Sequence, residues 1–234
     1  MIALRMTAYA ALMTGVVALS PAIADEAMPS FNCKKATTKI EKLVCEDEFL
    51  GFRDGALGAL YRALEPSRAK IPDLRSMMRH WLRGRDTVCG RARTREKMVA
   101  CLTRRYEAIL RRLSGRMAQA RLGPAGRGLK PLAGVYVAKA EGFAGTIRLV
   151  ELPGLGAHVE ISTVSGRNAH ICLLRTASAR RSGNTVRWRD KDEPKCQVTL
   201  RFKGGAVKPV ATPACRRYYC GANTDFIDFP YKRR

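Results

Sequence analysis

The chain has 234 residues, of which 46% are hydrophobic, and it carries 43 lysines and arginines against 20 acidic residues. This hydrophobic content excludes an intrinsically disordered chain, and the length allows one large or two small domains with a buried core. The formal charge of +23 indicates anionic surroundings or an anionic partner, without specifying which.

The first 24 residues have the features of a secretory signal peptide. Arg5 gives a positive start, residues 6–19 are uncharged and mostly apolar, and Ala22 and Ala24 are the small residues that a signal peptidase reads. The alternative is a membrane anchor, but the apolar stretch is shorter than the roughly 20 residues needed to span a bilayer. We therefore expect cleavage near Ala24 and a periplasmic or secreted mature chain with no transmembrane segment.

Eight cysteines follow the predicted leader, and an even number of cysteines in an exported chain is typical of a disulfide framework. They form two groups of four: Cys33, Cys45, Cys89 and Cys101, then Cys172, Cys196, Cys215 and Cys220. Zinc binding is the rival interpretation, but the sequence has no C-x-x-C and its three histidines are not spaced as ligand pairs. We expect no metal and no cofactor.

A stretch rich in glycine and proline, residues 123–131, separates the two groups of cysteines and coincides with a change in hydrophobic period. We interpret it as a linker between a helical domain at residues 25–122 and a β-rich domain at residues 132–234. The predicted fold class is therefore α+β by separate domains, with a disulfide-bonded helical domain followed by a small antiparallel β-barrel or sandwich.

Apolar residues recur at helical spacing throughout the first half of the chain. These stripes predict a short helix after Thr37 or Thr38, a helix from about Leu50 to Leu64, a helix from about Leu74, and a long helix that ends at Ser114–Gly115.

The second of these stripes contains three glycines, Gly51, Gly55 and Gly58, and each is expected to cost about 1 kcal/mol relative to alanine inside a helix. Either another backbone approaches this side of the helix closely, or the helix is simply weak. The sequence leaves both interpretations open.

The cysteines of the first half are equally spaced, because Cys33 and Cys45 are 12 residues apart and so are Cys89 and Cys101. Paired positions in antiparallel segments have a constant sum, which favours nested bridges Cys33–Cys101 and Cys45–Cys89 in one hairpin. Four cysteines allow three pairings, so a chance coincidence is the alternative.

The first half also contains a characteristic order of segments: Phe31-Asn32-Cys33, then Ile40-Glu41-Lys42-Leu43-Val44-Cys45, then Trp81-Leu82-Arg83, Cys89, Cys101 and Tyr106. Over residues 30–115 this order resembles the LprI-like lysozyme inhibitor N-terminal domain family. The resemblance implies an exported, disulfide-bonded helical module that is not an enzyme and that, in characterised relatives, blocks lysozyme. The three glycines depart from the family's more usual Ala, Glu or Leu.

The second half alternates apolar and polar residues in short runs that glycine and proline turns separate, which is typical of an antiparallel meander. These runs lie at residues 135–137, 146–150, 158–162, 171–175, 185–188 and 197–202. We expect seven or eight strands, a bridge between Cys172 and Cys196 on neighbouring strands, and a bridge that closes the loop from Cys215 to Cys220.

No combination of residues in the sequence indicates catalysis. His80 is expected at the boundary of a helix face, and His158 and His170 lie in predicted strands with no free nucleophile beside them. The acidic run from Asp190 to Glu193 suggests paired carboxylates or a calcium loop, but its basic neighbours favour a solvated turn. We predict that the protein is not an enzyme.

Lysozyme inhibition is the first binding function that we expect. A basic or hydroxylated loop would pair with the catalytic carboxylates of a lysozyme and exclude the sugar. Two loops carry such residues: Ser165, Arg167 and Asn168 in one, and Arg216, Arg217, Tyr218 and Tyr219 in the other. Many animal lysozymes are themselves cationic, so charge repulsion would slow their encounter with this chain.

Binding to an anionic envelope is the second function that we expect. The basic residues would contact phosphates of lipopolysaccharide or phospholipid, although a merely solvated basic surface is the alternative. We do not expect nucleic acid as a third partner, because alternation in a strand places an aromatic side chain and its flanking arginines on opposite faces.

Overall fold

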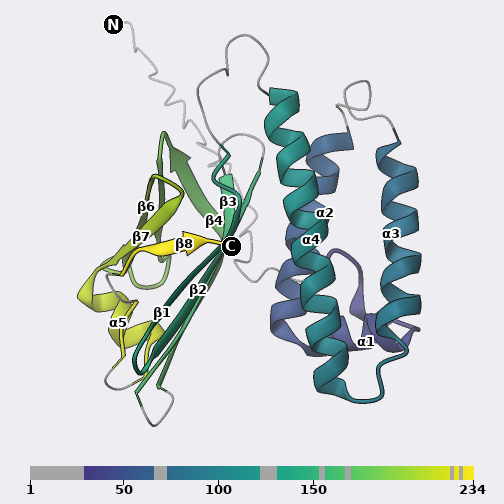
Figure 1. Cartoon of the computed structure of the whole chain (residues 1–234), viewed down its shortest axis with the longest axis horizontal. Coiled ribbons are helices and arrows are strands. Elements are labelled where there is room, and N and C mark those ends of the chain that lie inside the picture. The colour runs from purple at the N-terminus through teal and green to yellow at the C-terminus, as the bar shows by residue number, and fades with distance from the viewer. Residues whose placement is uncertain are drawn as a thin grey trace, which may run out of the picture.

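Figure 1 shows the computed structural model of the chain, in which a group of helices lies beside a closed β-barrel. The structure describes residues 29–65, 73–121, 131–152, 156–166, 170–221, 224–226 and 229–234. The predicted leader and nearly all of the predicted linker lie outside these residues. The chain is mixed α+β, with helices before strands as predicted, and its division into two domains stays a prediction.

Four α-helices build the described helical part, and each coincides with a predicted apolar stripe. They are α1 (Lys39–Glu46), α2 (Glu48–Leu64), α3 (Leu74–Cys89) and α4 (Arg95–Arg121), and a short 3-10 helix, η1 (Cys33–Lys35), precedes them. Thr38 caps α1 in a capping box with Glu41. The apolar faces meet in one core that includes Leu60, Leu102 and Tyr106.

The predicted end of α4 is wrong, because the helix runs through Ser114–Gly115 and continues to Arg121. Met117 is buried one turn after buried Leu113, so the apolar stripe goes on past the glycine. Gly115 also lacks the positive φ that a glycine at a helix C-terminus usually adopts.

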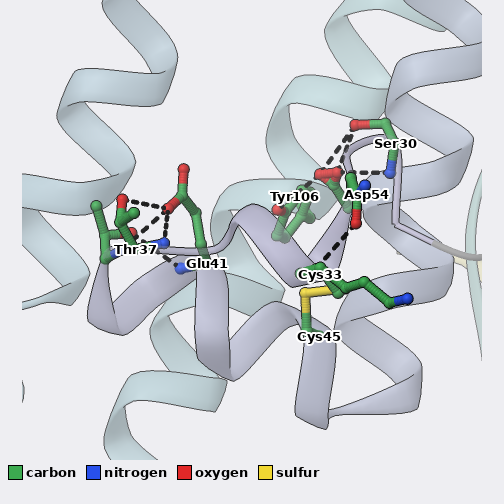
Figure 2. Close-up of a disulfide and its surroundings, with 10 residues drawn as sticks. Ser30, Cys33, Thr37, Glu41, Cys45, Asp54 and Tyr106 are labelled. Atoms are coloured by element: carbon green, nitrogen blue, oxygen red, sulfur yellow. Dashed lines mark hydrogen bonds between the residues drawn. A yellow bond between two sulfur atoms is a disulfide. The ribbon is translucent and has the colours of Figure 1, made fainter.

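Gly51 and Gly58 of α2 make room for the chain segment that precedes η1. A Cβ at Gly58 would lie 2.4 Å from the Cβ of Ser30, and one at Gly51 would lie 3.3 Å from Cγ of Pro29. Figure 2 shows Ser30 beside Asp54 of α2, and the Ser30 hydroxyl donates to Asp54 Oδ1 at 2.7 Å. For Gly51 and Gly58, the structure favours the close approach of another part of the chain over a merely weak helix.

Gly58→Ala is expected to destabilise the protein, whereas Gly115→Ala is expected to stabilise it. A methyl group at Gly58 would displace Ser30, but nothing lies within 4 Å of a Cβ at Gly115. Alanine is favoured over glycine inside a helix by about 1 kcal/mol, so Gly115→Ala should raise the free energy of unfolding by about that amount. Urea unfolding measures both variants, and equal stabilisation by both would contradict the close approach at Gly58.

The second half forms a closed barrel of eight antiparallel strands in which neighbours in sequence are neighbours in the sheet, and β8 pairs with β1. The strands are β1 (Gly134–Ala140), β2 (Phe143–Glu151), β3 (Gly156–Ser165), β4 (His170–Ser182), β5 (Thr185–Arg189), β6 (Gln197–Lys203), β7 (Ala206–Ala211) and β8 (Tyr231–Arg233). A barrel rather than a sandwich is thus formed. The six alternating runs found in the sequence did not include β7 or β8, and the short helix α5 (Pro213–Tyr219) was not predicted.

Alternate side chains of the strands fill the inside of the barrel. Ile147, Ile161, Leu174 and Tyr231 are among the buried residues of this second core. A side chain at position 145 would clash with the core, because a Cβ on Gly145 would lie 2.6 Å from the Tyr231 ring. The side chains that alternate with these inward-facing ones point outward, and they form the outer face of the barrel that contacts the helices or solvent.

The cysteines of the helical part pair as Cys33–Cys45 and Cys89–Cys101, so the predicted nested pairing is wrong. Each bridge links elements that follow one another in the chain: η1 to the end of α1, and the last residue of α3 to α4. The equal spacing therefore reflects two similar local connections rather than one antiparallel pair.

The barrel disulfides are Cys172–Cys220 and Cys196–Cys215, so both predicted bridges are wrong here too. Cys172 lies on β4 and Cys196 just before β6, and β5 separates these strands in the sheet. Cys215 and Cys220 stand near the two ends of α5, where each reaches a different part of the barrel. The two bridges hold α5 at both ends.

Candidate functional site

One end of the barrel joins segments that are far apart in the sequence. In Figure 1, α5 lies on the side of the barrel that faces away from the helices. Its C-terminal neighbour Cys220 is bonded to Cys172 of β4, and the Gly221 amide donates to the Ile171 carbonyl at 2.9 Å. The Ser165 hydroxyl donates to Thr224 Oγ1 at 2.6 Å. Ser165 of one predicted binding loop and the end of α5 in the other therefore belong to the same end of the barrel.

Large apolar side chains are exposed at this end of the barrel. Ile171 is 52% exposed and stands opposite exposed Val164 across β3 and β4, and Tyr218 of α5 is 60% exposed. Exposed Phe229 contacts the ring of Phe143 at 5.8 Å between centroids. We call the set Val164, Ile171, Arg217, Tyr218 and Phe229 the barrel-end surface.

The predicted binding residues have different surroundings at this end. Arg217 and Tyr218 are exposed, whereas Arg216 pairs with Asp225 and Ser165 is bonded to Thr224. Arg167 and Asn168 lie outside the described residues.

Tyr219 is turned inward, where it packs edge-on against Trp188 with ring centroids 5.7 Å apart, and its hydroxyl donates to Asp190. Sequence reasoning missed Val164, Ile171 and Phe229. Ile171 was detectable, because an inward Cys172 forces its neighbour in the strand to point outward.

The acidic run was predicted as a solvated turn, but one of its residues, Asp190, is buried and holds the turn through hydrogen bonds. The buried Asp190 carboxylate accepts the amides of Asp192 and Glu193, at 2.7 and 3.1 Å from Oδ1. Burial opposes ionisation of Asp190, but the hydrogen bonds from Tyr219 and these amides outweigh it, so the Asp190 pKa is lowered. No cluster of metal-ligating side chains occurs among the described residues.

A chain of charged side chains joins the helices to the outer face of the barrel. Glu160 of β3 is almost fully buried and accepts from Arg53 of α2 at 2.9 Å and from Arg148 of β2 at 2.7 Å, both on Oε1. Arg148 also donates from Nε to Glu107 of α4 at 2.7 Å. Two arginines and two glutamates thus balance each other between α2, α4 and the barrel.

Aromatic contacts flank these charges. Arg175 stands opposite Glu160 in the sheet and lies over the Phe49 ring of α2, 5.1 Å from its centroid. The rings of Phe52 and His158 are 5.4 Å apart. Beyond them, Val150 at the end of β2 packs into the helical core. The described helical and barrel parts therefore share a contact region with both apolar and charged side chains.

His158 is buried in this region beside a cavity of about 30 Å³ that Phe52, Arg53 and Glu160 also line. Its Nδ1 has no hydrogen-bond partner among the described residues. Burial lowers the His158 pKa from 6.5 to about 4, because the charged imidazolium would lose its hydration. His158 is accordingly neutral in the folded protein near pH 7, and it packs against Phe52 as an aromatic core residue.

Acidification is expected to destabilise the protein through His158. The unfolded chain binds a proton at His158 below about pH 6.5 and the folded chain only near pH 4, so the free energy of unfolding should fall across that window. The full shift corresponds to about 3 kcal/mol. Urea unfolding of wild type and His158→Phe at several pH values isolates the effect, since the variant lacks the titrating group. Parallel pH profiles would contradict it.

No family model, curated protein or solved structure matches the chain. Within the part of the chain that the structure describes, no helix has both the length and the apolar character to cross a bilayer. The function therefore has to be argued from the residues and contacts of the chain itself.

Proposed function

We propose that this is an exported, non-enzymatic protein that binds another protein through its barrel-end surface. The observation that carries the proposal is the exposure of Val164, Ile171, Tyr218 and Phe229. Val164 and Ile171 pair across β3 and β4, Tyr218 precedes Cys220, which is bonded to Cys172, and Phe229 contacts Phe143, so all four belong to segments that meet at one barrel end. Exposed Arg217 directly precedes Tyr218 in the sequence. Aromatic residues and arginine are enriched in protein interfaces, and gathered exposed apolar side chains often mark one.

The barrel-end surface is also held in place before any partner arrives. The Cys172–Cys220 disulfide and the bond from the Gly221 amide to the Ile171 carbonyl fix the end of α5 against β4. The Cys196–Cys215 disulfide fixes the start of α5 beside β6. A rigid binding surface loses little conformational entropy on association, which favours affinity.

A lysozyme is the partner that we propose for this surface. Support comes from the resemblance of residues 30–115 to the LprI-like family and from the chemistry of the lysozyme cleft, where two carboxylates perform catalysis. Arg217 makes no ion pair with a described residue, so its guanidinium is available to such a carboxylate. Tyr218 beside it would occupy the space of a sugar ring.

Export is supported by the leader pattern and by the disulfides. All eight cysteines are paired in four disulfides, which persist in oxidising compartments and are rare in the cytosol. Free thiols in the native protein purified from its own compartment would argue against export.

The proposal is tested by titrating the oxidised protein into c-, g- and i-type lysozymes and measuring cell-wall hydrolysis. We expect inhibition of at least one class. For a cationic lysozyme, inhibition should strengthen with added salt, because salt screens the repulsion between two positive proteins. If no class is inhibited at micromolar protein, the lysozyme proposal is wrong.

Two variants then test the surface itself. Ile171→Ser and Tyr218→Ser are each expected to weaken inhibition about tenfold or more, since a residue central to an interface contributes at least 1 to 2 kcal/mol. Val88→Ser is the matched control, because Val88 on α3 is 52% exposed, as Ile171 is. Equal weakening by the control, or none in the barrel variants, would place the interface elsewhere.

A further inference from the structure

A second region with binding character lies in the helical part, far from α5 in the fold. A hollow of about 510 Å³ opens between α1 and the start of α4. Its lining consists of Lys39, Lys42, Leu43, Glu46, Arg93, Thr94, Arg95 and Met98. Volumes of this order are typical of small-molecule sites, roughly 300 to 1,000 Å³.

The charge of this hollow is strongly unbalanced. Four of its lining residues are cations, and Glu46 is the single acid. Glu46 is already engaged by Arg95, with 2.7 Å between Oε2 and Nη1. Lys39, Lys42 and Arg93 are exposed and make no ion pair with a described residue. The hollow therefore carries a net charge of +3 with three cations available to a ligand.

The cations line a single hollow that is large enough for a small ligand. Lys39, Lys42 and Glu46 stand three and four residues apart on α1, so they share one side of the helix. Arg93 and Thr94 face them from the segment that leads into α4, and Leu43 and Met98 form a buried apolar floor. The Cys89–Cys101 disulfide ties the last residue of α3, just before that segment, to the second turn of α4.

We infer that this hollow binds a phosphate-bearing anion. A single carboxylate would leave most of the +3 charge unbalanced. A phosphate monoester carries about 1.5 to 2 negative charges near pH 7, and a pair of phosphates carries about two or more. Arginine, lysine and a threonine hydroxyl are the side chains that donate to phosphate oxygens. The inference is independent of the lysozyme proposal, and it gives the expected binding to an anionic envelope a specific site.

Inorganic pyrophosphate is the first probe, titrated calorimetrically into the oxidised full chain at roughly physiological ionic strength. We expect a single site in the wild type. Lys42→Gln/Arg93→Gln should weaken binding about 25-fold, since each surface cation contributes roughly fivefold. Arg187→Gln/Lys203→Gln is the matched control, because it removes one arginine and one lysine that are also exposed, on β5 and β6. We expect it to change affinity by less than about twofold.

A vesicle experiment distinguishes the two sources of phosphate. Sedimentation with vesicles of phosphatidylglycerol and phosphatidylcholine, in which Lys42→Gln/Arg93→Gln loses binding and the control pair does not, would support a lipid headgroup as the ligand. Pyrophosphate binding without vesicle binding would support a soluble phosphate compound. Absence of pyrophosphate binding, or equal loss in both double variants, would overturn the inference, and neither outcome bears on lysozyme inhibition. Unchanged unfolding midpoints would show that the exposed substitutions leave the fold intact.

Discussion

Glu160→Gln is expected to lower the free energy of unfolding by about 3 to 5 kcal/mol. The Glu160 carboxylate accepts from Arg53 and Arg148 with its side chain only 1% exposed, and the Arg53 side chain is 7% exposed. A glutamine of the same shape keeps the packing but removes the carboxylate of Arg53 and leaves Arg148 with Glu107 as its one remaining anion among the described residues. Removing one partner of a buried ion pair costs far more than the intact pair contributes.

Glu107→Gln is the control for this prediction. Among the described residues, Glu107 forms an ion pair with Arg148 alone, and its side chain is less buried than that of Glu160. Its replacement should cost only about 1 to 2 kcal/mol. Urea unfolding measures both variants, and a loss below about 1 kcal/mol in Glu160→Gln would show that the buried charges do not stabilise the contact between helices and barrel.

The same variant tests whether the helical and barrel parts unfold together. Trp81 lies on α3 and Trp188 on β5, so Trp81→Phe and Trp188→Phe leave one fluorescent reporter in each part. We expect coincident transitions in the wild type, because Val150 and the charged contacts join the parts. In Glu160→Gln the two transitions should separate. Separate transitions already in the wild type would show that the contact region does not couple the two parts.

Local periodicity predicted most of the elements. The apolar stripes that begin near Leu50 and Leu74 correspond to α2 and α3. Thr38 caps α1, as expected of a threonine that directly precedes an apolar stripe. Six alternating runs became β1 to β6. Elements without a clear signal were missed, because β8 has three residues and α5 has seven. The prediction that the long helix ends at Gly115 was wrong, because buried Met117 extends the apolar stripe beyond that glycine.

Long-range pairing was not predictable from spacing. Cys172 and Cys196 were expected on neighbouring strands, but the missed helix α5 brings Cys215 and Cys220 to them instead. Strand alternation indicates that His158 and Glu160 point away from the barrel interior, where solvent would be expected. Which part of the barrel the helices cover depends on the docking of α2 and α4, and no local pattern encodes that docking. The charged contacts between the helices and the barrel could therefore not be predicted from the sequence.

Removal of the Cys172–Cys220 disulfide by Cys172→Ala/Cys220→Ala is expected to destabilise the barrel by about 4 kcal/mol. The bridge closes a loop with a sequence separation of 48, whereas Cys196–Cys215 closes one of 19. Since a longer loop loses more entropy in the unfolded chain when it is closed, Cys196→Ala/Cys215→Ala should cost about 3 kcal/mol, the smaller loss.

The two double variants should also differ in what happens to the barrel-end surface. Without Cys172–Cys220, the C-terminal end of α5 is released from β4, and the backbone at exposed Arg216 and Arg217 becomes open to trypsin. Without Cys196–Cys215, that end stays bonded to Cys172, next to the Ile171 carbonyl that accepts from Gly221. Limited digestion should therefore cut at these arginines first in Cys172→Ala/Cys220→Ala, and that variant should lose lysozyme inhibition while still folded. Equal cleavage in both would mean that the 172–220 bridge does not hold the surface together.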